Sequence, residues 1–298
     1  MRNNFYFQLR GYSKNSALII IVVCCFFCLS FPSKSTELLW VSPALNHDHR
    51  SRLDVSSMLL IQKYLKDTSF IRVTANVSRT FKILNTESDA CTGNMLKTQD
   101  RQSRFYMTNL PQVIAVGLRL YVVKGSAIDT ILAAQTADNA KVDLEWLLKL
   151  TAFKSIGIAD GRSYGEYLDK ALANHAVASK IWVRHGSDVF SGSLKMLTQK
   201  RMQALIEYPT AVSFYTNSIP ASINLNSYAL KGATAFNLGY IMCSRTKNGL
   251  KLTQMLDETL NKLSHTREFY QLQLKWNSQV PEQEFNRLYK KIYDLDTK

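Results

Sequence analysis

Cysteine is scarce in this sequence, and no two cysteines are spaced for metal binding or redox chemistry. Of five cysteines, three lie in one apolar run near the start, Cys24, Cys25 and Cys28. The other two, Cys91 and Cys243, are far apart, and neither belongs to a CxxC pair. The chain therefore offers no thiolate zinc site and no redox motif. In an oxidising compartment two distant cysteines are compatible with one disulfide or with two buried thiols.

Other features that the sequence lacks exclude further classes of protein. Basic residues are scattered singly among acids, without a Lys/Arg-rich run, so nucleic-acid binding is not expected. The sequence has no Walker-type loop and no dinucleotide fingerprint, so we expect no cofactor. His47 and His49 have no third ligand nearby, and we expect no metal site. Gly/Ser linkers and internal repeats are also missing, which indicates domains joined by short crossings.

One long apolar run, residues 17–31, stands near the start of the chain. Basic residues precede it and small residues follow it, namely Arg2, Arg10, Lys14, Ser33 and Ser35. This order is typical of a cleaved export signal, here residues 1–35. The alternative is an uncleaved anchor, but a helix of this length rises only about 22 Å, and a bilayer core is about 30 Å thick. We therefore expect a periplasmic mature protein.

The remaining part of the chain is large enough for one large or two medium domains, and it is basic. The whole sequence has a formal net charge of +14, and residues 1–35 contribute four basic residues and no acids, which leaves +10. Outside the cytoplasm such a charge favours solubility and weak attraction to an anionic envelope, or binding of an anionic ligand.

Short β-like runs alternate with amphipathic helical runs, which favours an α/β fold with largely parallel sheets. Strands are expected at residues 38–42, 70–75, 90–96, 113–123, 155–160, 181–184, 202–208 and 239–243. Helices are expected at residues 55–66, 78–84, 144–153, 166–178, 193–198, 249–263 and 266–276.

Four segments, in this order along the chain, resemble the type 2 periplasmic solute-binding proteins, specifically extracellular family 3, which includes polar amino-acid binders. Residues 97–111 are similar to the family's T-x-x-R followed by an aromatic-S/T-x-P stretch. Residues 156–165 look like its second-lobe strand and small-residue turn, and residues 194–208 resemble its L-x-x-G-R-x-D-A-x-I element. Residues 256–276 are similar to its closing helices.

The resemblance implies a periplasmic binding protein-like II fold of two α/β lobes, each a mostly parallel sheet flanked by helices, with two crossings. Lobe one would be residues 36–116 plus 234–298, and lobe two residues 117–233. Cys91 and Cys243 would both lie in lobe one, which favours a disulfide between them. The protein would be a non-catalytic monomer that captures a small polar solute for an ABC permease. A receptor that reports the solute to a membrane sensor protein is an alternative.

For lobe one, the resemblance assigns the ligand's carboxylate to Arg101, the arginine of the T-x-x-R motif. A guanidinium is a planar, permanently charged donor, which suits a carboxylate. Thr98, three residues earlier, would cap or orient it. Trp40 lies near the region where the family often places an aromatic ring against the ligand, although it also fits a core position.

For lobe two, Ser163 and Gly165 would line the cleft at a helix N-terminus, where backbone N–H groups favour anions. Amino-acid binders usually place an aspartate at the end of a second-lobe strand to bind the ligand's ammonium. This chain has Glu207 and Tyr208 there, so we expect one of them to face the other end of the ligand.

A serine hydrolase is the alternative from another class. Residues 161–165 satisfy G-x-S-x-G between a strand and a helix, with Ser163 as the nucleophile. Asp188 or Asp257, followed by His265, would give a triad in chain order. The chain after Ser163 is short and largely helical, without a glycine-rich histidine loop, so we favour the binding protein.

Overall fold

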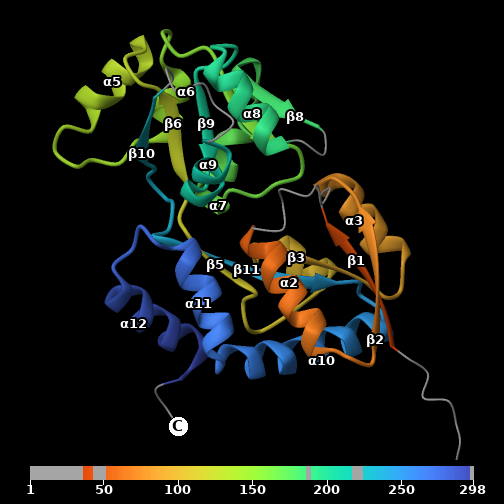
Figure 1. Ribbon diagram of the computed structural model, residues 1–298. Coiled ribbons are helices and arrows are strands. Elements are labelled where there is room, and N and C mark those ends of the chain that lie inside the picture. Colours follow the sequence, from red (N-terminus) through yellow and green to blue (C-terminus); the bar gives the residue numbers. More distant parts are fainter. Residues whose placement is uncertain (1–35, 43–51, 186–188, 217–223, 296–298) are drawn as a thin grey trace, which may run out of the picture. The chain divides into compact units, whose positions relative to one another are not determined.

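The computed structural model describes residues 36–42, 52–185, 189–216 and 224–295 (Figure 1). The expected signal peptide, the histidines at positions 47 and 49, and Asp188 lie outside the described residues. Residues Glu37–Lys298 belong to one structural unit, and this unit contains two β-sheets. We call each sheet with its helices a lobe.

Lobe one has a six-stranded sheet in the described part of the chain. Its strands are β1 (Thr36–Ser42), β2 (Thr68–Thr74), β3 (Ala90–Met95), β4 (Tyr106–Met107), β5 (Val113–Val116) and β11 (Phe236–Cys243). Its helices are α2 (Leu53–Tyr64), α3 (Val77–Thr86), α4 (Gln99–Arg104), α10 (Lys247–Ser264), α11 (Arg267–Trp276) and α12 (Glu282–Tyr293). Strands β1 and β3 pair parallel, whereas β11 pairs antiparallel with β3, β4 and β5.

Lobe two has a five-stranded sheet in the order β10-β6-β9-β7-β8, again counted over the described residues. Its strands are β6 (Arg119–Val123), β7 (Ile156–Ala159), β8 (Ile181–Arg184), β9 (Ala204–Glu207) and β10 (Leu225–Ala229). Its helices are α5 (Ala127–Gln135), α6 (Leu144–Lys149), α7 (Glu166–Leu172), α8 (Val189–Thr198), α9 (Pro209–Thr216) and the 3-10 helix η2 (His175–Lys180). Strand β7 pairs parallel with β8 and β9, and β6 pairs antiparallel with β9 and β10.

The two-lobed α/β architecture confirms the predicted fold class, but both sheets are mixed rather than mostly parallel. The chain leaves lobe one through β5 and returns through β11, and these two strands are neighbours, with Phe236 opposite Val116. It likewise enters lobe two through β6 and leaves through β10, with Leu225 opposite Val123. In each sheet the strand through which the chain enters and the strand through which it leaves are neighbours and meet at the same end. Two such strands must run antiparallel to each other.

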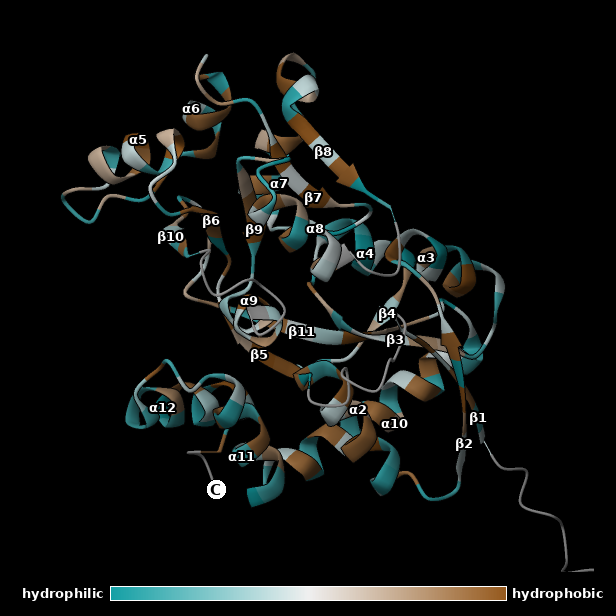
Figure 2. Ribbon diagram, turned by 45° about the horizontal axis from the view of Figure 1, so that its top comes forward, coloured by the Kyte–Doolittle hydropathy of each residue, from teal (hydrophilic) through white to brown (hydrophobic). Residues whose placement is uncertain are grey.

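Amphipathic helices cover the lobe-one sheet, and α10 shows why they form where the sequence predicted them. Thr246 precedes the helix, and its side chain accepts a hydrogen bond from the Gly249 backbone N–H at 2.9 Å. The buried leucines of α10 recur every three or four residues and make one apolar face, Leu252, Leu256, Leu260 and Leu263. Hydrophobic and hydrophilic residues alternate along α10 and α12 in Figure 2.

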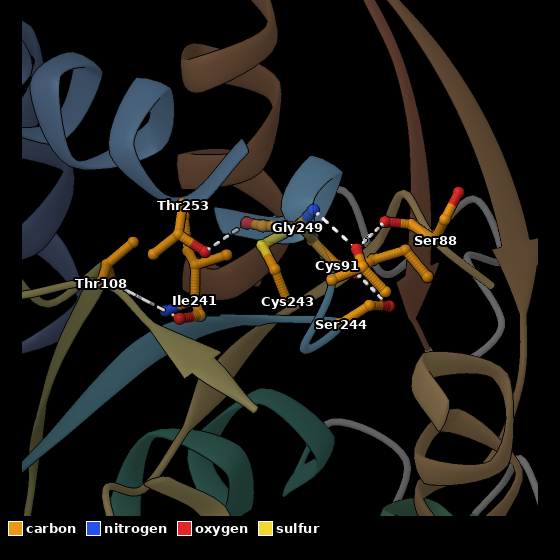
Figure 3. Close-up of a disulfide and its surroundings, with 10 residues drawn as sticks. Ser88, Cys91, Thr108, Ile241, Cys243, Ser244, Gly249 and Thr253 are labelled. Carbon is orange, nitrogen blue, oxygen red and sulfur yellow. Dashed lines mark hydrogen bonds between the residues drawn. A yellow bond between two sulfur atoms is a disulfide. The ribbon is translucent and has the colours of Figure 1, made fainter. Parts of the chain in front are cut away.

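Cys91 and Cys243 form a disulfide inside lobe one (Figure 3). Cys91 lies in β3 and Cys243 ends β11, where the two residues are opposite each other in the antiparallel pair. Both side chains are fully buried beneath α10. The bond therefore joins the first part of lobe one to the strand that returns after lobe two, 152 residues later.

Removing this disulfide should destabilise the protein because it cross-links a long loop of the unfolded chain. We expect the double variant Cys91→Ala/Cys243→Ala to lose about 2–4 kcal/mol of the free energy of unfolding. Urea denaturation followed by circular dichroism measures this loss, and wild-type protein unfolded with a reducing agent should show a similar shift. Identical midpoints for the wild type and the variant would contradict the prediction.

Side chains of α11 complete the lobe-one sheet along β5. One edge of β5 pairs with β11, and on the other edge Gln273 accepts from the Ile114 N–H at 3.0 Å and donates to the Gln112 carbonyl at 2.8 Å. Asn277 accepts from the Val116 N–H at 3.1 Å and donates to the Ile114 carbonyl at 2.8 Å. Because buried backbone groups need partners, these two fully buried amides take the place of a neighbouring strand.

Candidate ligand-binding site

A cavity of about 170 Å³ is lined by residues of both lobes. Its charged lining groups are Arg52, Asp54 and Arg101 from lobe one and Arg162 from lobe two. Most of the remaining wall is apolar or aromatic and includes Met95, Val113, Phe190, Phe214, Tyr215 and Trp276. Such a mixture, an apolar wall with a few placed polar groups, is typical of small-molecule sites.

Arg101 is buried at the cavity, and it has no carboxylate partner within the described part of the chain. Thr98 caps α4, and its hydroxyl accepts from the Arg101 backbone N–H at 3.3 Å. The Arg101 Nη1 donates to the Leu96 carbonyl at 3.0 Å, and the guanidinium carbon lies 5.5 Å from the Phe81 ring centre. None of the ion pairs among the described residues includes Arg101. Burial lowers the pKa of Arg101 because it removes water from the cation.

Arg162, in contrast, is paired inside lobe two. Its two terminal nitrogens donate to the two carboxylate oxygens of Glu207 at 2.7 and 2.8 Å. Its guanidinium carbon also lies 5.0 Å from the Tyr208 ring centre and 5.1 Å from that of Tyr164. Burial alone would lower the pKa of Arg162, but the charge and hydrogen bonds of Glu207, together with Tyr164 and Tyr208, outweigh it and leave the pKa raised. Glu207 therefore balances a buried cation and does not line the cavity.

Aromatic and cationic side chains of the two lobes contact one another around the cavity. Arg52 of lobe one pairs with Asp54 at 2.7 Å, and its guanidinium lies 5.2 Å from the ring centre of Phe190 in lobe two. Arg162 lies 5.3 Å from the same ring. Phe214 of α9 stacks on Trp276 of α11, with ring centres 6.2 Å apart. Contacts of this kind are favourable, so they stabilise the arrangement in which the lobes meet.

The other lobe-two residues expected at the site divide into two groups. Ser163 and Tyr208 line the cavity, whereas Gly165 does not. Ser163 donates to Asp169 at 2.5 Å and accepts from the Gly165 N–H at 3.2 Å. Gly165 precedes α7 with a φ of +97°, which explains a glycine there. The Tyr208 hydroxyl accepts from Asn237 of lobe one at 3.1 Å, and burial raises the pKa of this tyrosine, which keeps it neutral.

In lobe one, Trp40 lies in the core, not at the cavity. It is 2 % exposed and packs against Phe70, with ring centres 6.4 Å apart. Its strand β1 is central in the sheet, between β2 and β3, so a large apolar residue there is buried beneath helices. Thr98 does not line the cavity; it caps α4, the helix that carries Arg101.

Sequence reasoning missed most of the residues that line the cavity, among them Arg52, Arg162, Phe190, Phe214 and Trp276. Arg162 carried a signal, because it stands between two glycines directly after a strand, in the segment assigned to the cleft. The aromatic residues carried none, because rings at helical spacing are more often part of a core than of a ligand site.

The described residues show no sign of the serine-hydrolase alternative, and Asp188, one of its candidate acids, lies outside them. Ser163 is hydrogen-bonded to Asp169 in lobe two. Asp257 lies on α10 of lobe one, where it accepts from the Asn109 N–H at 2.7 Å. His265 follows the same helix, with Nδ1 2.7 Å from the Asn261 carbonyl. Ser163, Asp257 and His265 are thus each hydrogen-bonded to other residues, and these three do not form a triad.

No family model and no curated protein match the chain. Solved structures do match: the probable amino-acid ABC transporter extracellular-binding protein ytmK from Bacillus subtilis is 17 % identical, with a TM-score of 0.55, over 82 % of this chain and 98 % of that one. An arginine 3rd transport system periplasmic binding protein from Legionella pneumophila is 15 % identical, with a TM-score of 0.58, over 81 % and 100 %. A histidine kinase sensor domain similar to periplasmic binding proteins is 12 % identical, with a TM-score of 0.59, over 81 % and 95 %.

The likeness extends over both lobes, since about four fifths of the chain aligns with nearly the whole of each of these structures. Within the described residues no helix combines the length and apolarity needed to cross a bilayer. At these levels of identity the likeness concerns the fold, and it agrees with the resemblance given by the four sequence segments. The chain therefore has the two-lobed fold of the type 2 periplasmic binding proteins.

Proposed function

We propose that the protein is a periplasmic solute-binding protein that captures a small polar solute of amino-acid size, bearing a carboxylate, between its two lobes. Arg101 carries this proposal, because it is a buried guanidinium without a carboxylate partner among the described residues, and it lines a cavity shared by both lobes. Binding a carboxylate there would satisfy the remaining N–H groups of Arg101 in an environment that excludes water.

The lobe-two side of the cavity fits the same role. Ser163 and the neutral Tyr208 lie opposite the lobe-one arginine and offer hydroxyl groups to a polar ligand. A solute that contacts both lobes binds the closed arrangement more tightly than an open one, so binding and closure are linked. We propose no catalytic step and no cofactor for this site, and we propose that the protein acts as a monomer.

We favour the role in which the protein delivers its solute to an ABC importer, because the matching structures include binding proteins of transport systems. One observation supports a second role, a receptor for a membrane signalling protein: a histidine kinase sensor domain matches the chain equally well in fold. The genes beside this one distinguish the two roles, since an importer requires permease and ATPase subunits. Either role places the protein outside the cytoplasm after removal of residues 1–35.

A thermal-shift screen of residues 36–298 against amino acids, small organic acids and short peptides tests the proposed function. A ligand present at a hundredfold excess over its Kd stabilises the native state by about 2.7 kcal/mol. For a chain of this size that corresponds to a rise of about 5–10 °C in Tm. We expect at least one carboxylate to give such a rise and its uncharged amide to give none. If no carboxylate raises the Tm, the proposal is wrong.

A further inference from the structure

The charges at the cavity are not those of a site for a zwitterion. Three guanidinium groups, Arg52, Arg101 and Arg162, line it, together with one carboxylate, Asp54. Asp54 already accepts two hydrogen bonds from Arg52, at 2.7 and 3.1 Å. Glu207, the acid that the sequence suggested for an ammonium group, accepts two from Arg162.

The two acids whose charges act on Arg101, Asp100 and Asp169, are also occupied, since Asp100 pairs with Arg104 at 3.4 Å. Asp169 accepts from the Ser163 hydroxyl at 2.5 Å and from the Tyr164 N–H at 2.7 Å, and it does not line the cavity. Over the described part of the chain, each carboxylate at or beside the cavity is therefore hydrogen-bonded to protein donors. A ligand ammonium would be removed from water next to the Arg101 cation, with no free carboxylate among the described residues to receive it, and burial of an unpaired charge is unfavourable.

The wall offers large apolar surfaces in place of an amine acceptor. Aromatic rings come from both lobes: Phe190, Tyr208, Phe214, Tyr215 and Trp276. Met95 and Val113 extend this apolar surface in lobe one. Flat apolar groups pack well against such rings, whereas a strongly hydrated group next to them would lose its water.

From this arrangement we infer that the ligand is a carboxylate with a flat, apolar body and without a charged amine. The inference rests on the proposed function and narrows its ligand class: the carboxylate is the polar end of the solute, and the rest of the solute is apolar. Arg101 binds the carboxylate, and the aromatic rings of both lobes enclose the rest of the molecule. The paired acids exclude α-amino acids that have the same carbon skeleton.

Isothermal titration with matched probes tests this discrimination. 3-Phenylpropanoate, L-phenylalanine and 3-phenylpropanamide share one skeleton, and they differ only in the α-ammonium and in the charge of the carboxyl group. We expect 3-phenylpropanoate to bind at least about tenfold more tightly than either of the other two, a difference of about 1.4 kcal/mol. L-Phenylalanine binding as tightly as 3-phenylpropanoate, or an α-amino acid as the best hit of the thermal-shift screen, would overturn the inference and leave the proposed function intact. If no carboxylate binds at all, both are wrong.

A variant that supplies the missing acceptor provides a second test. Thr210 lines the cavity in the first turn of α9, where an aspartate is compatible with the helix. We expect Thr210→Asp to shift the ratio of the two Kd values toward L-phenylalanine by about tenfold, because charges a few Å apart interact strongly in a protein interior. Thr210→Asn has nearly the same shape without the charge and should leave that ratio unchanged. Equal ratios in the two variants would contradict the electrostatic explanation.

Discussion

The variant Glu207→Met should lose about 3–5 kcal/mol of the free energy of unfolding, because it leaves Arg162 buried without a counter-charge. The two side chains are 6 % and 13 % exposed, and two short hydrogen bonds join them. Methionine fills a volume similar to that of glutamate but accepts no hydrogen bond from a guanidinium. The cost therefore comes from the uncompensated cation and not from a void.

The double variant Arg162→Met/Glu207→Met is the matched control for this prediction. Replacing a buried ion pair with apolar residues of similar volume is often neutral, so the double variant should recover most of the stability lost in Glu207→Met. Urea denaturation of the wild type, both single variants and the double variant gives the coupling free energy between the two residues. If the double variant is as unstable as the sum of the single variants, the pair does not act through its charges.

The variant Arg101→Met should reduce affinity for the best-binding carboxylate of the thermal-shift screen by at least about 30-fold, since losing one partner of a buried, hydrogen-bonded charge pair costs about 2–5 kcal/mol. Methionine keeps the apolar stem of the side chain and removes the charge. Arg101→Lys keeps the charge but loses the planar fork, so its affinity should lie between those of the wild type and Arg101→Met.

Arg104→Met is the control for the Arg101 variants, because Arg104 lies on the same helix α4 and also stacks on Phe81, with its guanidinium 5.7 Å from the ring centre. Its side chain is 44 % exposed and pairs with Asp100. Isothermal titration should give Arg104→Met the affinity of the wild type. Equal losses in the variants at positions 101 and 104 would mean that α4 acts on binding only through its fold.

Elements with a regular apolar pattern and a clear beginning could be predicted from the sequence. Helix α10 is expected at residues 249–263 and found at Lys247–Ser264, because leucines recur on one face and Thr246 caps it. Helix α12 was not predicted. Its apolar residues do recur at helical spacing and pack against the lobe-one core, namely Phe285, Leu288, Tyr289, Ile292 and Tyr293, but no side chain caps the start of this helix after Pro281.

Residues of the site could be predicted only where a local motif marked them. Arg101 and Ser163 stand in segments with family resemblance, and both line the cavity. The Arg162–Glu207 pair joins residues 45 positions apart and depends on the sheet order. Strands β7 and β9 are parallel neighbours, so the residue that ends β9 meets the turn that follows β7. Sequence spacing does not reveal which strands are neighbours.

The amides that hold α11 against β5 also restrict how the cavity can open. Gln273 and Asn277 make four hydrogen bonds to the β5 segment, three of them buried, and Trp276, the last residue of α11, stands between them in the chain. The indole of Trp276 must therefore stay with lobe one if the cavity opens. Its stack with Phe214 of lobe two is a contact that such an opening would break.

The two crossings between the lobes touch just beyond Val116. The Gly117 N–H donates to the Ala235 carbonyl at 2.7 Å, and a Cβ at Gly117 would lie 1.8 Å from the Thr234 carbonyl oxygen. This glycine lets the outgoing and returning chains run in direct contact, so a short double strand, rather than a loose linker, joins the two lobes.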